Sequence, residues 1–589
     1  MGITAITIEN FKGFKDPVRI ELKPITLLFG PNSAGKSTII QALHYAREIF
    51  ERGNLDPDRT ISGGDAINLG GFQNLVHRQL KQEKEIKLGF ELDLSNETLP
   101  SYLDFDNLAW VEKARELAEE DYEDDTYKEW QDQVDYLTDI PTCVKTAAIT
   151  ITIRWNEALK KPYVASYHVS INGDLFAKIE ASSDSQKIKL LYLEVYHPIF
   201  YTSEDWEFLS PLFKDLNINT IRDEIETILK DLSGKTKEEI TISNQTRNKI
   251  FHFFSTGLFS KIFNEPNSDG ADVFRQILKG KKSIGLYQDS VLPTWGKQIK
   301  METDIGLPQD KTSNLFFSTI SSLIVGPGEL IRKFLQQTCY LGPLRELPSR
   351  NHRPNRSPDE SRWAKGLAAY DTLFQADDDF IKKINGWLTQ EKRLHSSYSV
   401  KVKKYRELEE DNPLTSAILN NQSLENAKEL WESLSPKRRL LFRDEKMDMD
   451  LAPQDIGVGI SQVLPVIVAA LNAESGIVAI EQPELHIHPA FQVALGDLFI
   501  EQVRQHHDVV FLLETHSEHL LLRLLRRIRE ANEQEAPKNL ILTPNDLSIY
   551  FIEHGENGVS CQYIRVDEDG DFIDRWPKGF FNERVEELY

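Results

Sequence analysis

Cysteine is scarce in this chain of 589 residues: the three cysteines, Cys143, Cys339 and Cys561, lie far apart. Such spacing argues against a disulfide framework and is typical of a reducing compartment. No run of 18 or more uncharged apolar residues occurs, so we expect no membrane-spanning helix. The N-terminus, MGITAITIENF, has a strand pattern without a basic region before an apolar core, so we expect no signal peptide. These absences together predict a cytoplasmic protein.

Positive charge is also in short supply. The chain has 69 Lys and Arg against 92 Asp and Glu, for a net charge of −23. Nucleic-acid phosphates are bound by clustered Lys and Arg, so this protein is not expected to coat nucleic acid over its whole surface. Contact with DNA or RNA would need a local basic patch or a partner. Long heptad stretches are absent as well, which excludes long coiled-coil arms.

Apolar residues, in contrast, are plentiful at 40%, with 10% aromatic, and this is ample for globular cores. A chain of this length exceeds one ordinary core, so two or more structural units are expected.

The hydrophobic pattern predicts an α/β fold, with strand-like segments at both ends of the chain. An apolar run, ITLLF, enters a glycine-rich loop, and the helix STIIQALHYAREIFER that follows should end at Gly53. Residues 86–195 favour antiparallel strands with a hairpin at 172–174, interrupted by an acidic, solvated helical segment at 101–140. Residues 200–333 have helical spacing. Apolar strands return at GIVAIEQ, DVVFLLETH, SIYFIEH and CQYIRV.

These patterns predict a mixed sheet with an antiparallel β subdomain and a helical insertion. We expect a first lobe at 1–199, a helical insertion at 200–335, a second lobe at 336–535 and a small β-containing segment at 536–589.

The strongest motif is GPNSAGKST, which satisfies G-x-x-x-x-G-K-[ST] between a strand and a helix. Backbone N–H groups at such a helix start point at phosphate oxygens, and the helix dipole adds to the attraction. Lys36 should reach the β- and γ-phosphates of ATP, and the Ser37 hydroxyl should bind Mg²⁺. The predicted nucleotide-binding residues are Gly30, Asn32, Ser33, Ala34, Gly35, Lys36, Ser37 and Thr38.

Two apolar strands end in polar residues downstream. IVAIEQPELHIHP places Glu481 at a strand tip, where a carboxylate can hold Mg²⁺. FLLETHSEHLL places His516 after another strand, where it could sense the γ-phosphate. His486 and His488 beside Glu484 have no ligand set, so we interpret them as structural.

A second glycine-rich helix start lies in DIGVGISQVLPVIVAAL, where Gly459, Ser461 and Gln462 precede or open an apolar helix. Backbone amides and a hydroxyl at this start could bind the anion of a second nucleotide. An ordinary glycine-rich helix entry accounts equally well for the segment viewed alone.

The order of GPNSAGKST, YLGPLRELPSR, DIGVGISQVLP, IEQPELHIHP and ETHSEHLL resembles the ABC-type ATPases of the structural-maintenance and RecF group. The resemblance is closer to the overcoming-lysogenization-defect branch of bacterial defence systems. It covers both ends of the chain but not the middle. It implies two subunits that sandwich two ATP molecules. It also implies Glu481 and Gln73 at the metal, Ser461 at the opposing γ-phosphate and His516 as a switch histidine.

Two departures from that family bear on activity. Gln482 stands where members often carry the glutamate that activates the attacking water. An amide cannot accept a proton, and a general base contributes roughly 10²–10⁴-fold to the rate. Glu484 could substitute if its loop turns inward. ATP therefore acts either mainly as a dimer latch or as the fuel of a cycling enzyme, and both interpretations stay open.

The second departure is the missing Toprim nuclease domain. Fewer than about eighty residues follow His516, which is short for such a domain. DEDGDFID, at 567–574, has the pattern of a hairpin rather than of a metal site. A cut in nucleic acid would then need a nuclease as a separate partner chain.

The leading hypothesis is a dimeric, slowly hydrolysing ATPase that serves as the sensor or scaffold of an anti-phage defence complex. The alternative is a RecF-like repair ATPase that clamps DNA. The signature GISQ and the large insertion disfavour a transporter subunit. Nucleic acid stays open as a partner because of three basic stretches, LLRLLRRIRE, KVKKYR and SPKRRLLFR, each weak evidence alone.

Overall fold

The computed structural model describes residues 2–77, 84–103, 137–182, 187–194, 197–200, 284–301, 311–350, 354–355, 359–420, 423, 426–555 and 558–577. The chain forms two compact units. The first contains residues 1–11, 16–20 and 76–333, and the second contains residues 12–15, 21–75 and 334–589.

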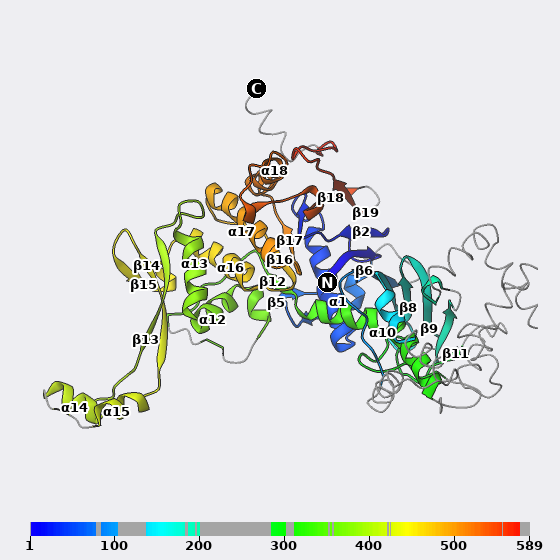
Figure 1. Ribbon diagram of the computed structural model, residues 1–589, viewed down its shortest axis with the longest axis horizontal. Helices are drawn as coiled ribbons and strands as arrows, with labels where there is room; N and C mark the ends of the chain where they lie inside the picture. The colour runs from blue at the N-terminus through cyan, green and yellow to red at the C-terminus, as the bar shows by residue number, and fades with distance from the viewer. Residues whose placement is uncertain are drawn as a thin grey trace, which may run out of the picture. The chain divides into compact units, whose positions relative to one another are not determined.

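The first unit is built on an eight-stranded sheet of order β11-β10-β9-β8-β7-β6-β1-β2 (Figure 1). Its strands are β1 (Gly2–Glu9), β2 (Val18–Glu21), β6 (Glu85–Asp93), β7 (Thr146–Asn156), β8 (Lys161–Ile171), β9 (Asp174–Ala181), β10 (Ile188–Leu193) and β11 (Ile284–Gly285). From β11 through β1, each neighbouring pair is antiparallel. Asn172 and Gly173 join β8 to β9 with φ of 49° and 94°. Positive φ at both positions is typical of a type I′ turn, so the predicted hairpin is confirmed.

A long helix, α10 (Lys311–Gln336), packs on this unit through close main-chain approaches. The Tyr167 hydroxyl of β8 donates a 2.8 Å hydrogen bond to the carbonyl oxygen of Ile324. A Cβ atom at Gly328 would lie 2.5 Å from the ring of Trp295, so only glycine lets the indole approach. Short helical turns occur at η1 (Ile140–Cys143) and η2 (Pro198–Phe200).

The second unit contains a six-stranded sheet of order β12-β16-β17-β3-β18-β19. Its strands are β3 (Ile25–Phe29), β12 (Cys339–Leu341), β16 (Gly476–Glu481), β17 (Val509–Glu514), β18 (Leu547–Gly555) and β19 (Gly558–Ile564). All neighbours pair in parallel except β18 with β19. β3, β16 and β17 are buried along almost their whole length, as continuous apolar runs in a parallel sheet should be.

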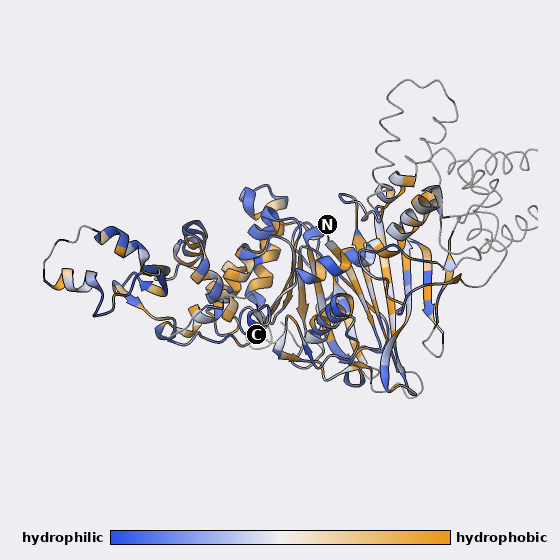
Figure 2. Ribbon diagram, turned by 90° about the horizontal axis from the view of Figure 1, so that it is seen from below, coloured by the Kyte–Doolittle hydropathy of each residue, from blue (hydrophilic) through white to orange (hydrophobic). Residues whose placement is uncertain are grey.

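Helices complete the core of this unit, and Figure 2 shows hydrophobic residues concentrated along the strands. The helices of this unit are α1 (Lys36–Arg52), α2 (Phe72–Leu75), α11 (Ser361–Ala364), α12 (Leu367–Gln375), α13 (Asp378–Thr389), α14 (Pro413–Leu419), α15 (Ala427–Ser433), α16 (Val458–Asn472), α17 (Pro489–Gln505) and α18 (Glu518–Asn532). Of these, α12, α13, α16, α17 and α18 supply buried residues to the core. Short turns are η3 (Pro453–Asp455), η4 (Lys538–Leu540) and η5 (Pro544–Asp546). Helix α1 ends at Gly53, which has φ of 64° and caps the helix as predicted.

Two smaller sheets belong to the second unit. One is the pair β4 (Arg59–Thr60) and β5 (Gly64–Asn68). The other is β13 (Tyr398–Tyr405), β14 (Lys437–Asp444) and β15 (Met449–Leu451), whose first two strands form a long ribbon in Figure 1.

The α/β class, with a mixed sheet and an antiparallel β unit, is confirmed. The acidic segment at 101–140 and the insertion at 200–335 lie mostly outside the described residues; of the helices predicted there, the described residues include α10. The four-part domain division stays a prediction. No helix in the described ranges is both long and apolar enough to cross a bilayer.

Candidate functional site

The glycine-rich loop joins the end of β3 to the start of α1 and curls around one ammonium group. The Nζ of Lys36 donates to the carbonyl oxygens of Gly30 at 3.0 Å and Pro31 at 2.9 Å. Gly30 and Gly35 have φ of 142° and 108°, and a Cβ at Gly30 would lie 2.0 Å from the carbonyl oxygen of Ile552. Glycine is therefore required at Gly30 both by conformation and by space. The loop places the first N–H groups of α1 around the position where a phosphate chain would lie.

Two carboxylates meet at the carboxyl edge of the sheet beside this loop. Parallel pairing places Glu481 of β16 opposite Glu514 of β17, and Glu514 in turn opposite Leu28 of β3. The Ser37 hydroxyl donates a 2.7 Å hydrogen bond to Glu514, and the Lys36 ammonium lies 3.7 Å from the same carboxylate. Glu481 accepts a 2.9 Å hydrogen bond from the Tyr340 hydroxyl.

Glu514 is the residue that the sequence interpretation missed. Only His516 was assigned from its segment, yet Glu514 touches both key side chains of the glycine-rich loop. A signal was present, because FLLETH has the same apolar-strand-then-glutamate pattern as IVAIEQ. What the pattern could not give is the strand order, which inserts β17 between β16 and β3.

The electrostatics of this edge favour a bound cation. Burial, together with the neighbouring Glu514 carboxylate, raises the pKa of Glu481 to about 7. Burial lowers the pKa of Lys36, although Glu514 counteracts this. A divalent cation would offset the repulsion between the two carboxylates.

The oxygen donors of Ser37, Glu481 and Glu514 suit Mg²⁺, which takes one or two carboxylates and completes its shell with water and substrate phosphates. Among the described residues, no group of three or more His, Cys, Asp and Glu side chains could hold a metal alone. The donor set therefore fits a magnesium ion that arrives with a nucleotide.

The loop after β16 turns Glu484 inward. Its carboxylate accepts hydrogen bonds from the Thr515 hydroxyl at 2.8 Å and from the main-chain N–H of His516 at 2.7 Å. Burial raises the pKa of Glu484. The Glu484 carboxylate therefore lies at the end of β17, and its role as the base in place of Gln482 stays a prediction.

Gln482 itself is held through its main chain. Its N–H donates to the Glu514 carbonyl at 2.7 Å, and its φ is 46°, a left-handed conformation.

His516, directly after β17, is half-buried, and burial with the nearby Lys36 charge lowers the pKa of its imidazole. A lowered pKa keeps this histidine neutral at pH 7.

The helix start predicted to face a second nucleotide is at α16. Gly457 is exposed and Val458 is 61% exposed, so the start of this helix is open to solvent. Ser461, however, is buried, and its hydroxyl donates to the Val458 carbonyl at 2.8 Å. Gly459 is half-buried. The roles of Gly459 and Ser461 at a nucleotide stay predictions.

Gln462 contacts protein main chain rather than solvent. Its side-chain amide donates to the Arg345 carbonyl at 2.9 Å, and its oxygen accepts from the Arg345 N–H at 3.4 Å.

Gln73, proposed at the metal, is exposed on α2. The predicted roles of Gln462 at the nucleotide and of Gln73 at the metal likewise remain untested.

Arg345 is a second residue without a predicted role. Only 4% exposed, it donates through one guanidinium nitrogen to the carbonyls of Glu481 at 2.8 Å and Gln482 at 3.1 Å. Through the other it reaches the carbonyl of Gln462 at 3.4 Å. Arg345 therefore connects the start of α16 to the carboxylate edge, and its motif, YLGPLR, was the available signal.

Two further predictions concern His488 and the arginines of α18. The His488 side chain accepts from the Ala490 N–H and caps α17, as a structural residue should. On α18, Arg527 pairs with Asp497 at 2.8 Å and Arg523 lies 3.8 Å from the same carboxylate. These arginines are engaged in intramolecular ion pairs, which leaves little charge for nucleic acid.

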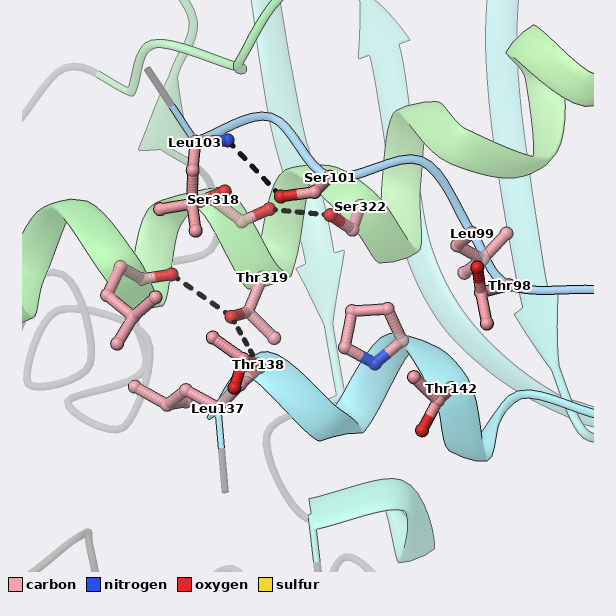
Figure 3. Close-up of a pocket in the computed structure, with 12 residues that line it drawn as sticks. Thr98, Leu99, Ser101, Leu103, Leu137, Thr138, Thr142, Ser318, Thr319 and Ser322 are labelled. Carbon is pink, nitrogen blue, oxygen red and sulfur yellow. Dashed lines mark hydrogen bonds between the residues drawn. The ribbon is translucent and has the colours of Figure 1, made fainter. Parts of the chain in front are cut away.

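A hydroxyl-rich cavity of about 180 Å³ lies in the first unit beside α10 (Figure 3). Thr319 donates to the carbonyls of Leu137 and Leu315, each at 3.0 Å, and Ser322 donates to the Ser318 carbonyl. No described residue lining this cavity is charged. Its described lining therefore offers hydroxyl groups and apolar side chains but no cationic side chain.

Comparison with known proteins identifies the family. A family model described as "AAA ATPase domain" matches residues 1–160 and 368–521, which together exceed half of the chain. The chain belongs to the AAA ATPase domain family. This AAA ATPase is thereby an ATP-binding protein, and the matched ranges contain the glycine-rich loop, α16 and both glutamates at the sheet edge. A second model, "Protein of unknown function (DUF3696)", matches residues 542–589.

Solved structures similar to the AAA ATPase include SMC head domains. A head bound to the C-winged helix domain of ScpA has 9% identity, TM-score 0.33, and coverage of 96% of this chain and 99% of that one. A Pyrococcus furiosus-derived complex of a head with the C-terminal domain of ScpA has 10% identity, TM-score 0.32, and 96% coverage of each chain. The head from Thermotoga maritima has 8% identity, TM-score 0.31, and coverage of 96% of this chain and 100% of that one. No curated protein matches the chain.

Proposed function

We propose that this protein is a magnesium-dependent ATPase of the ABC type that binds ATP at the glycine-rich loop and hydrolyses it slowly. The observation that carries the proposal is the meeting of Lys36 and Ser37 with Glu514 at the carboxyl edge of the sheet. A cation, a hydroxyl and carboxylates at the start of a helix are the groups that a magnesium-bound triphosphate needs.

In this proposal Lys36 and the N–H groups at the start of α1 bind the phosphates, while Ser37, Glu481 and Glu514 hold Mg²⁺. Bound there, Mg²⁺ neutralises charge on the phosphate oxygens. Glu484 takes the proton of the attacking water, since burial raises its pKa toward the operating pH. His516, kept neutral, orients the γ-phosphate side of the site.

Slow turnover follows from the bonds that Glu484 already makes. Its two oxygens accept from Thr515 and His516, so a water must compete with these donors for the carboxylate. Gln482 offers no base in compensation. ATP then remains bound for long periods relative to its hydrolysis.

We further propose that two copies enclose the nucleotides, with the exposed start of α16 of one copy facing the ATP of the other. The exposure of Gly457 and Val458 supports this role, because a solvent-exposed apolar side chain at a helix start is suited to an interface. Gly459, Ser461 and Gln462 would complete that surface, and Gln73 would lie near the metal.

The cellular role proposed is that of sensor or scaffold in an anti-phage defence complex, with a separate nuclease as effector. This role rests on the resemblance of the five motifs to the overcoming-lysogenization-defect branch. Affinity purification from phage-infected cells that express the tagged chain tests it. A bound nuclease and loss of protection in Lys36→Ala cells are expected, and protection that is absent in wild type would contradict it.

Binding of MgATP to the purified chain tests the biochemical proposal. Wild type should bind, and Lys36→Ala should lose at least tenfold in affinity, whereas Lys12→Ala, which removes a lysine bonded to Gln41, should bind like wild type. Equal affinity of Lys36→Ala and wild type would reject the glycine-rich loop as the nucleotide site.

A further inference from the structure

The ribbon of β13 and β14 concentrates positive charge in a protein whose net charge is −23. The two strands hold seven basic residues and one acidic residue, Asp444. They derive from KVKKYR and SPKRRLLFR, two stretches separated by residues 407–434 that pair only in the tertiary structure. Figure 1 draws this ribbon at the left of the picture.

Alternation along the strands separates a packed face from an open face. Val400, Leu440 and Phe442 are buried on one face, where β13 contacts α13 and β14 contacts α12. Cross-strand partners share a face, so Lys403 and Arg439 lie opposite each other on the other face. Both side chains are exposed.

Most of the other basic side chains on the ribbon already serve the fold. Arg438 donates to the carbonyls at the end of α12, from 3.2 to 3.4 Å. Lys401 and Arg443 pair with Asp450, at 3.0 and 3.2 Å. Lys437 pairs with Glu407. These contacts give the charges at those positions a role within the fold.

Within the described residues, no contact of this kind explains the charges of Lys403 and Arg439. Within the ranges that the structure describes, neither has a carboxylate within 4.0 Å, and like charges directly opposite each other destabilise a sheet. The guanidinium of Arg439 lies 5.2 Å from the ring centroid of Tyr405, a cation–π contact that orders it without neutralising it.

We propose that the open face of this ribbon, centred on Lys403 and Arg439, binds the phosphate backbone of duplex DNA. Charge complementarity selects this partner, since a polyanion resolves the repulsion that the fold maintains. A two-stranded β-ribbon also fits the major groove, which is about 12 Å wide. The inference does not depend on ATP binding at the glycine-rich loop.

The test is fluorescence anisotropy of a labelled 30-base-pair duplex titrated with the full chain between 50 and 200 mM NaCl. Lys403→Gln with Arg439→Gln should weaken binding at least tenfold at 100 mM and reduce the slope of log Kd against log salt by about 2. The control, Lys160→Gln with Lys382→Gln, removes two exposed lysines elsewhere and should bind like wild type.

The ribbon variant, relieved of the like-charge repulsion, should unfold at the wild-type temperature or above it. ATP turnover of both double variants should equal that of wild type, which separates this proposal from the ATPase proposal. Charge reversal, Lys403→Glu with Arg439→Glu, should weaken binding further. Equal affinity of the ribbon variant and its control would overturn the proposal. So would wild-type binding absent at 50 mM NaCl, or a ribbon variant that alters only self-association.

Discussion

The main-chain N–H of His516 donates a 2.7 Å hydrogen bond to the Glu484 carboxylate, which joins the loop after β16 to the loop after β17. The Thr515 hydroxyl occupies the other carboxylate oxygen at 2.8 Å. Glu484 is therefore positioned from the strand that also carries Glu514. A displacement of either loop would move the proposed base and the proposed switch histidine together.

Glu484→Gln should lower steady-state ATP turnover by roughly 10²-fold or more, because the amide cannot accept a proton from water. Its binding of MgATP should change little. Gln482→Glu should raise turnover by an order of magnitude if the position after Glu481 reaches the water. Turnover in Glu484→Gln equal to that of wild type would exclude Glu484 as the base.

Glu514→Gln should weaken binding of MgATP by about tenfold or more, while ATP without metal binds as in wild type. The amide keeps the shape of the side chain and can still accept from Ser37, but it removes the charge that faces the cation. Calorimetric titration with and without Mg²⁺ measures the affinity for MgATP and the affinity for ATP without metal. Glu553→Gln, an exposed glutamate on β18, is the matched control, and an equal loss there would contradict the assignment.

Arg345→Met should lower the free energy of unfolding by about 3 kcal/mol, because three carbonyl oxygens lose a charged donor in a buried place. Arg345→Lys should recover only part of the lost free energy of unfolding, since an ammonium lacks the bidentate geometry of a guanidinium. Arg350→Ala, which removes an exposed pair with Asp455, should stay within about 0.5 kcal/mol. Urea denaturation provides the comparison.

His44 should make stability depend on pH. It is fully buried in α1, its Nδ1 lies 2.9 Å from the Ser62 hydroxyl, and burial together with Arg47 lowers its pKa to about 3. The unfolded chain, with an ordinary histidine pKa near 6.5, binds the proton more readily. The stability due to neutral His44 is thus complete above pH 6.5 and is lost as pH falls toward 3.

From pH 7.5 to pH 5.5, the free energy of unfolding should fall by about 1.4 kcal/mol more in wild type than in His44→Gln. Urea denaturation at the two pH values measures the difference. His488→Gln, which changes an exposed histidine, should keep the wild-type dependence. The same pH dependence in His44→Gln and wild type would show that His44 is not the group responsible.

The sequence by itself determined the local features of this protein. Gly30, Gly35 and Lys36 specify the phosphate loop through conformations and spacing that act over a few residues. Gly53 ends α1, and Asn172 with Gly173 forms a hairpin, for the same reason. The continuous apolar runs of β3, β16 and β17 likewise indicated strands, although not how these strands pair.

Only the tertiary structure decided which residues meet. Glu514 reaches Ser37 because β17 lies between β16 and β3, and strand order in a parallel sheet is set by crossover connections rather than by local pattern. Arg345 joins two distant segments for the same reason. Lys403 and Arg439 form one charged surface only because β13 and β14 pair in register across the helical segments between them. Contacts of this kind depend on long-range packing, which no local stretch of sequence encodes.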